Sequence, residues 1–420
     1  MSGRKSLKFP ERFLWGAATS AHQIEGGLHN QWTVWELENA RALAAQAPYH
    51  YSDLERWPAI KKQAQNPANY VSGKAIDHYK YFREDIALLK TLNLNAYRFS
   101  IEWSSIQPEE GIWNAGEVEH YRQVLMELKR QGIEPIVTLF HFTMPIWFAK
   151  KGGFEKRSNA RFFVEFVDKV MSEIGDLVTY VITINEMEVY ASESYIEGRW
   201  PPQAQSRIMA HRVLRNLIYT HNKTARLLKS RSTHYQVSIA KNSVYVYPGD
   251  DSWLSIKIAS LLQYYIDDFI LKRVMKQCDF IGVNYYFSNR VYGYRTHNPD
   301  EKVSDMGWDM QPANIQYVLE RLYEKYKKPI FITENGLADA DDNERQWWIT
   351  QTIIGIQRAL GSGVKIIGYL HWSLFDNFEW NKGYWPKFGL VEVDRRTMRR
   401  IPRKSAVWFG RVVKKLRGKR

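Results

Sequence analysis

The sequence predicts an α/β fold, a single-domain (β/α)8 barrel of the TIM type, from three observations. Short apolar runs recur eight times along the 420 residues, and segments with apolar residues at helical spacing separate them. No Ser/Gly-rich linker or abrupt change of composition divides the chain. Alternating strand and helix with a count of eight is typical of this barrel. The alternative is an open doubly wound sheet, but no Gly-rich phosphate loop follows the first run, where that fold usually carries one.

Each predicted strand is a short apolar run that ends in polar or aromatic residues. Between the runs, residues 81–92 and 118–132 are examples of the helical spacing. Residues 40–75 and 287–312 show less pattern, and we expect them to form loops over the end of the barrel that carries the site. The strands are predicted within residues 13–26, 95–103, 134–142, 180–186, 236–248, 279–286, 329–336 and 365–375.

Two of these runs end in a polar triplet that holds one glutamate. Glu186 follows Asn185 at the end of the fourth run, and Glu334 precedes Asn335 at the end of the seventh. A barrel places its chemistry at the carboxyl ends of its strands, so we expect both carboxylates to face one pocket. Two carboxyl groups in one pocket are the equipment for hydrolysing a glycosidic bond.

The surroundings of the two glutamates differ in the sequence. Met187 is an apolar neighbour that would raise the pKa of Glu186 and keep it protonated. Glu334 would need a cation and a hydroxyl donor to stay ionised, and Arg98 and Tyr286 are candidates. A gap of about 5–5.5 Å between the carboxyl groups would give retention of configuration and a larger gap inversion. The sequence leaves that choice open.

Eight segments of the chain, taken together, resemble glycoside hydrolase family 1, the β-glucosidase and β-glycosidase family. The likeness runs from about residue 8 to about residue 410. Any one segment is weak evidence, but all of them in the family's order are specific. They are FLWGAATSAHQIEG, DHYKYFREDIALLKTLNLNAYRFSIEW, VTLFHFTMP, GGF, TINE, DFIGVNYY, ITENG and GYLHWSLFDNFEWNKGYWPKFGLVEVD.

The resemblance implies a role for each matching residue. Glu186 would be the acid/base and Glu334 the nucleophile, at the ends of strands 4 and 7, with net retention. Arg98 and Tyr286 match the residues that tune the nucleophile, and Asn284 matches one that supports the acid/base. The family also tends to have a non-proline cis peptide after the tryptophan that matches Trp372. The sugar-binding residues correspond to Gln23, His141, Asn185, Trp372, Glu379 and Trp380.

Three departures from the family pattern concern the site. Met187 stands where the family nearly always has proline, which leaves the backbone after the acid/base less fixed. Phe142 occupies a place often held by tryptophan. Residues 187–278 form a shorter stretch than is usual, and this affects the aglycone side of the pocket.

The function implied is hydrolysis of terminal, non-reducing β-D-glucosyl residues, with galactosyl or fucosyl as further substrates. One alternative is a 6-phospho-β-glycosidase, for which Lys382 and Lys387 are mild signals and Glu379, which would repel phosphate, is a contrary one. A second is a transglycosylase that uses the same covalent intermediate. A third is a catalytically impaired carbohydrate-binding protein whose working part is a basic tail.

The formal net charge of +14 is concentrated at the end of the chain. Residues 395–420 hold twelve Lys or Arg and no Asp or Glu. We therefore expect a barrel domain over 1–410 and a basic tail over 411–420. A solvated helix end is favoured over contact with an anionic membrane or RNA, and no nucleic acid partner is expected.

The remaining composition argues for an ordinary enzyme with a small-molecule β-glycoside as its partner. The eleven histidines form no metal-binding motif, and Cys278 is the single cysteine, so we expect no metal and no cofactor. No run of 18 apolar residues or clear secretory signal appears, which predicts a cytoplasmic protein without a transmembrane segment. The sequence does not indicate an oligomeric state.

Overall fold

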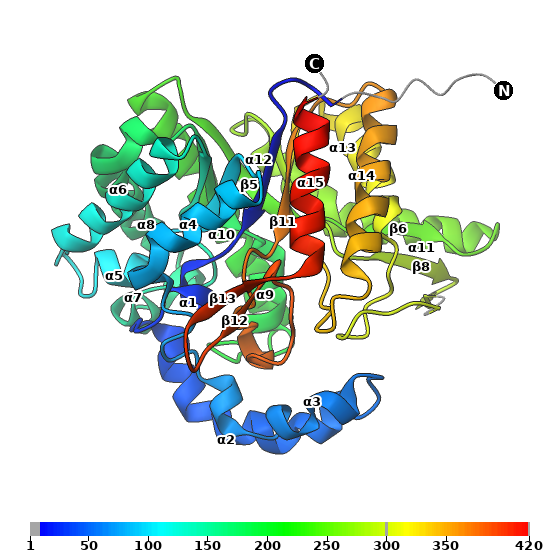
Figure 1. Cartoon of the computed structure of the whole chain (residues 1–420), viewed down its shortest axis with the longest axis horizontal. Coiled ribbons are helices and arrows are strands. Elements are labelled where there is room, and N and C mark those ends of the chain that lie inside the picture. Colours follow the sequence, from blue (N-terminus) through cyan, green and yellow to red (C-terminus); the bar gives the residue numbers. More distant parts are fainter. Residues whose placement is uncertain (1–8, 299–300, 419–420) are drawn as a thin grey trace.

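The centre of the computed structural model is a closed barrel of parallel strands (Figure 1). The structure describes residues 9–298 and 301–418. Neighbouring strands follow the order β1-β11-β10-β7-β5-β4-β3-β2, so the last barrel strand closes against the first. Each of the eight predicted ranges contains one barrel strand, which confirms the predicted fold class. The barrel strands are β1 (Leu14–Ala18), β2 (Ala96–Ser100), β3 (Glu134–Thr138), β4 (Tyr180–Asn185), β5 (Gln236–Asn242), β7 (Ile281–Asn284), β10 (Ile330–Asn335) and β11 (Ile366–Trp372).

Amphipathic helices surround the barrel and bury their apolar faces against it. In α8 (Ala160–Ile174) the buried Phe163, Phe166, Val167 and Val170 recur three and four residues apart, which places them on one face. The helical spacing at 81–92 and 118–132 corresponds to α4 (His78–Thr91) and α6 (Ala115–Arg130). The other main helices are α10 (Arg207–Arg231), α12 (Phe269–Val274), α13 (Ile315–Tyr326), α14 (Arg345–Gly361) and α15 (Lys404–Gly418).

The interior of the barrel is filled with side chains rather than open. Ala18, Ile136, Ile182, Phe331 and Leu370 belong to one buried cluster contributed by different strands. Such layers are typical of this fold, and they close the barrel from below. The open end, where polar side chains gather, is therefore the carboxyl end of the strands.

The expectation of loops over residues 40–75 is wrong. This region holds the end of α2 (Gln31–Tyr51), α3 (Trp57–Ala64) and a 3-10 turn, and these helices lie beyond the carboxyl ends of the strands (Figure 1). The buried face of α2 includes Ala40, Ala44 and Ala47. Alanine is a strong helix former but gives a weak hydrophobic signal, so the helical period is hard to see in the sequence.

Residues 287–312 are also more regular than expected. β8 (Ser288–Tyr292) pairs with β6 (Tyr245–Pro248) and with β9 (Arg295–Thr296) in a three-stranded sheet outside the barrel. The predicted strand 236–248 therefore comprises two strands, β5 in the barrel and β6 beside it. The sequence pattern alone did not show where the chain leaves the barrel.

Within the basic segment 395–420, residues 399–402 form the strand β13 (Arg399–Pro402) and residues 404–418 form the helix α15, which packs on the barrel. Residues 419–420 lie outside the described part of the chain. The predicted division at residue 410 falls inside α15, whose Phe409 and Val413 are fully buried. A Cβ at Gly410 would lie 2.7 Å from the carbonyl oxygen of Leu92, so α15 approaches the end of α4 closely there. Within the described part of the chain, the structure contains no helix long and apolar enough to cross a membrane.

Candidate active site

A cavity of about 390 Å³ opens at the carboxyl ends of the barrel strands, and Glu186 and Glu334 both line it. Eight of the eleven predicted site residues line this cavity. The other three, Gln23, Arg98 and Asn284, lie behind its wall and hydrogen-bond to lining residues. The lining residues among the predictions are His141, Asn185, Glu186, Tyr286, Glu334, Trp372, Glu379 and Trp380.

Glu186 lies at the junction between β4 and α9 (Met187–Tyr195). Its φ of 39° is in the left-handed region, and its backbone N–H donates to the Ala240 carbonyl at 2.8 Å. Asn284 Nδ2 donates to Glu186 Oε1 at 2.8 Å. Burial, followed by the nearby carboxylates of Glu334 and Glu188, raises the pKa of Glu186 well above its usual range. The environment therefore favours a protonated carboxyl group.

Met187 follows Glu186 as the first residue of α9, where proline was expected from the resemblance. Its side chain is fully buried in the main hydrophobic core. The turn is thus held by the packing of Met187 and by the hydrogen bond from Glu186 N–H to Ala240. These contacts supply restraint that a proline ring would otherwise provide.

Glu334 lies near the end of β10 and receives a donor on each carboxylate oxygen. Arg98 Nη1 donates to Oε1 at 2.6 Å, and the Tyr286 hydroxyl donates to Oε2 at 2.7 Å. Burial raises the pKa of Glu334 above its usual value, and the Arg98 charge and the Tyr286 hydrogen bond offset part of that rise. These guanidinium and hydroxyl donors stabilise the ionised form of Glu334, whereas the donor on Glu186 is the neutral amide of Asn284. The structure thus brings Arg98 and Tyr286 to the positions predicted for them.

One hydrogen-bond network joins the two glutamates through Asn185. Its Oδ1 accepts from Arg98 Nη2 at 2.7 Å and from Asn284 Nδ2 at 3.2 Å. Arg98 is also fixed by Thr138 Oγ1 at 2.9 Å. Because both donors of the network are buried and satisfied, the geometry of the carboxyl pair is held before any ligand binds.

His141 presents one free ring nitrogen among the described residues. Its Nε2 lies 3.3 Å from Asn185 Nδ2, an amide donor, so Nε2 accepts and Nδ1 carries the proton. Nδ1 is buried without a protein partner there. Burial, together with the Arg98 charge, lowers the pKa of His141 well below its usual value, so the ring is neutral. The His141 ring lies nearly parallel to the Trp372 and Trp380 rings, and its centre is 5.8 and 6.1 Å from their ring centres.

Glu379 forms another polar wall of the cavity. Gln23 Nε2 donates to its Oε2 at 3.4 Å and to the Phe378 carbonyl at 2.8 Å, so Gln23 holds the Glu379 segment from behind. Burial raises the pKa of Glu379 to about 7, against the opposing effect of Lys382. Lys382 lines the same cavity, and burial lowers its pKa.

Several lining residues were not found from the sequence. Trp308 comes from the segment 287–312, and its ring lies 5.7 Å from that of Tyr286. The ring centre of Trp200 lies 4.9 Å from that of Phe142. A second aromatic ring therefore packs beside Phe142, which is smaller than the tryptophan often found at its position. A tryptophan in a segment expected to cover the site was a usable signal for Trp308. Trp200 had none, since it lies in a loop without pattern.

Two further features complete the description of the site. The peptide bond between Trp372 and Ser373 is cis, as the resemblance implied. Within residues 9–298 and 301–418, no group of three or more His, Cys, Asp or Glu is placed to hold a metal ion. Glu193, which also lines the cavity, accepts two hydrogen bonds from Arg199.

Comparisons with known proteins agree with this geometry. The model of glycosyl hydrolase family 1 matches residues 5–277 and 262–417. Beta-glucosidase A of Thermotoga maritima is 31% identical, over 97% of this chain and 98% of the relative. A 6-phospho-beta-galactosidase of Clostridium acetobutylicum is 27% identical over 96% of each chain. The solved beta-glycosidase of Pyrococcus horikoshii superposes with a TM-score of 0.86 and 34% identity, covering 98% of this chain and 96% of its own.

The family model alone covers nearly all of the chain, and the full-length likeness to curated and solved relatives agrees with it. These findings favour the hydrolase over the non-enzyme alternative. The chain therefore belongs to glycosyl hydrolase family 1 and is a glycoside hydrolase that acts on O-glycosyl bonds.

Proposed function

We propose that this protein is a retaining β-glycosidase that hydrolyses terminal, non-reducing β-D-glucosyl residues. The observation that carries the proposal is the pair of buried glutamates in one cavity with opposite partners. Glu334 has a guanidinium and a hydroxyl donor on its two oxygens, whereas Glu186 faces other carboxylates. One carboxyl group kept ionised and one kept protonated are what the first step requires.

In the first step, the Glu186 carboxyl group gives its proton to the glycosidic oxygen while a Glu334 oxygen attacks the anomeric carbon. The bond to the leaving group breaks, and a covalent glycosyl-enzyme forms. Glu186, now ionised, then removes a proton from water, which attacks the same carbon and releases Glu334. Two displacements at one carbon restore the original configuration.

The sugar is held by groups that fit a neutral hexose. Asn185, Glu379 and the free Nδ1–H of His141 bind hydroxyl groups, and Gln23 acts by holding Glu379. The rings of Trp372 and Trp380 present apolar faces to the C–H side of the sugar. Galactosyl and fucosyl residues are further candidates, since they differ from glucosyl in only one or two hydroxyl groups.

A 6-phospho-β-glycosidase is the second candidate, because Lys382 lines the cavity and a curated relative bears such a name. Against it, Glu379 lines the cavity too, and its carboxylate repels a phosphate group. A transglycosylase remains the third candidate, since an alcohol in place of water would accept the same glycosyl group.

The test is release of nitrophenol from nitrophenyl β-glucoside, β-galactoside, β-fucoside and β-glucoside 6-phosphate. Glu334→Gln should abolish hydrolysis, and Glu165→Gln, an exposed residue of α8, is the matched control. Proton NMR should show the β-anomer of the sugar first. An undiminished rate in Glu334→Gln would contradict the residue assignment, and the α-anomer as first product would contradict retention. Added methanol should yield a methyl glycoside if the transglycosylase reaction competes.

A further inference from the structure

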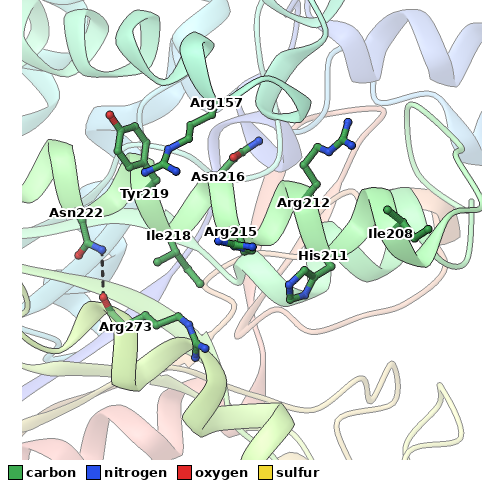
Figure 2. Close-up of a pocket in the computed structure, with 10 residues that line it drawn as sticks. All are labelled: Arg157, Ile208, His211, Arg212, Arg215, Asn216, Ile218, Tyr219, Asn222 and Arg273. Carbon is green, nitrogen blue, oxygen red and sulfur yellow. Dashed lines mark hydrogen bonds between the residues drawn. The ribbon is translucent and has the colours of Figure 1, made fainter.

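A second hollow, separate from the candidate active site, lies on the outer wall of the barrel between α10 and α12 (Figure 2). Its volume is about 590 Å³, within the range of small-molecule sites, and it shares no lining residue with the glutamate cavity. Arg157 precedes α8, Arg212 and Arg215 belong to α10, and Arg273 belongs to α12. All four line this basic groove, and no Asp or Glu does.

The four arginines of the basic groove lack counter-charges. Among the described residues, none of their guanidinium groups forms an ion pair, whereas Arg122 pairs with Asp176 at 2.7 Å on the same protein's surface. Like charges gathered in a concave surface raise the local positive potential and attract anions. The groove therefore carries a charge that the protein itself leaves unneutralised.

Two of these guanidinium groups are held in place. Arg157 lies 4.0 Å from the ring centre of Tyr219, and Figure 2 shows the two side by side. Arg273 lies 4.0 Å from the ring of Phe269 and donates to its carbonyl at 2.6 Å. Such contacts orient an arginine without neutralising its charge. The arginine side chains would therefore lose less conformational entropy when a ligand binds.

The groove also offers apolar surface. Ile208, at the start of α10, is 78% exposed and lines the groove together with Tyr219. Arg212 and Arg215 are three residues apart, so their side chains leave the same face of the helix. The combination suits a molecule with separated anionic groups joined by a carbon skeleton.

We propose that the basic groove binds an organic molecule with two or more phosphate groups. A guanidinium group matches phosphate with two parallel hydrogen bonds, and four of them balance two phosphate dianions. Ile208 and Tyr219 contact the carbon skeleton between the phosphates. The ligand is either a free bisphosphate or a lipid headgroup with the same chemistry. The proposal is independent of the glycosidase assignment.

Isothermal titration of the full-length protein with pyrophosphate and with fructose 1,6-bisphosphate tests the free form. Co-sedimentation with phosphatidylcholine vesicles, with and without cardiolipin, tests the lipid form. Loss of two charge-assisted hydrogen-bonding groups in R212A/R215A should weaken binding by about tenfold or more. The matched control K61A/K62A removes the same charge from exposed positions of α3 and should bind as the wild type does.

Each outcome decides the proposal. Binding of a soluble phosphate that falls in R212A/R215A and persists in K61A/K62A supports a free ligand. Binding of cardiolipin vesicles alone, with the same dependence on Arg212 and Arg215, supports a lipid headgroup. No saturable binding of any probe, or equal binding by both double variants, overturns the proposal. Nitrophenyl glucoside hydrolysis and circular dichroism verify that R212A/R215A is folded.

Discussion

At the scale of single residues, the site depends on buried charges whose partners are far away in sequence. Arg98 lies on a predicted strand, and the sequence predicted that it would lie beside Glu334. Lys241 was not predicted, although it is fully buried and donates to Glu188 Oε1 at 2.8 Å. A lysine inside an apolar strand gives no sign of which acid will face it. Such pairs form only when the barrel closes, so local sequence cannot reveal them.

The pKa of Glu186 leads to a prediction about pH. Its folded pKa lies well above the unfolded value, so the protonated carboxyl favours the fold at low pH. That contribution is lost as pH rises through the folded pKa. Glu186→Gln removes the ionisable group, so its melting temperature should exceed that of the wild type increasingly toward alkaline pH.

The same variant should lose activity by about 10²–10⁴-fold, because no acid or base remains. The alkaline limb of the kcat/KM profile should disappear with it. Calorimetry from pH 5 to pH 9 and pH-rate profiles measure the two effects. A wild-type alkaline limb in Glu186→Gln would show that another group is the acid.

The buried Lys241 leads to a prediction about stability. Lys241→Met leaves Glu188 and Asp267 with one cation fewer, and breaking such a buried pair costs about 3–5 kcal/mol of unfolding free energy. The double variant Lys241→Met/Glu188→Met removes the uncompensated charge and should recover part of this loss. Urea unfolding of the three proteins measures it. Equal midpoints for Lys241→Met and the wild type would show that the pair contributes nothing.

At the scale of secondary-structure elements, the barrel strands could be predicted because buried parallel strands are continuous apolar runs. The second half of the helix α2 could not, since its buried residues are the alanines Ala40, Ala44 and Ala47. β8 and β9 lie outside the barrel. They are short strands with many partly exposed or exposed residues, so the alternating pattern of a strand is weak there. Long amphipathic elements are visible in a sequence, and short or alanine-rich ones are not.

The start of α9 leads to a prediction about packing. Met187 is fully buried directly after Glu186, so Met187→Ala should cost about 2–5 kcal/mol of stability and loosen the position of Glu186. Met187→Leu conserves volume and should cost less than about 1.5 kcal/mol. Unfolding curves and kcat measure both effects together. If alanine lowered stability without lowering kcat, the packing of Met187 would not position the acid.

At the scale of the whole molecule, the sequence located the basic residues but not their structural setting. Residues 411–418 of the predicted tail belong to α15, whose outer face carries basic side chains and whose inner face packs on the barrel. Arg411, Lys414 and Lys415 are exposed. The ring centre of Phe409, by contrast, lies 6.3 Å from that of Trp15 and 6.1 Å from that of Tyr369. The charge pattern dominated the prediction because basic residues outnumber the buried apolar ones in that segment.

Truncation after Trp408 should therefore damage the fold itself. It removes Phe409 and Val413, and the loss of one buried phenylalanine side chain alone costs about 3–5 kcal/mol. We expect a lower melting temperature or insoluble protein. Any effect of the basic face needs a different variant: R411Q/K414Q/K415Q keeps the packing and removes three charges. Unchanged binding of anionic vesicles and RNA by this folded variant would show that the basic face is only a solvated helix surface, and a stable truncation after Trp408 would contradict the structural role.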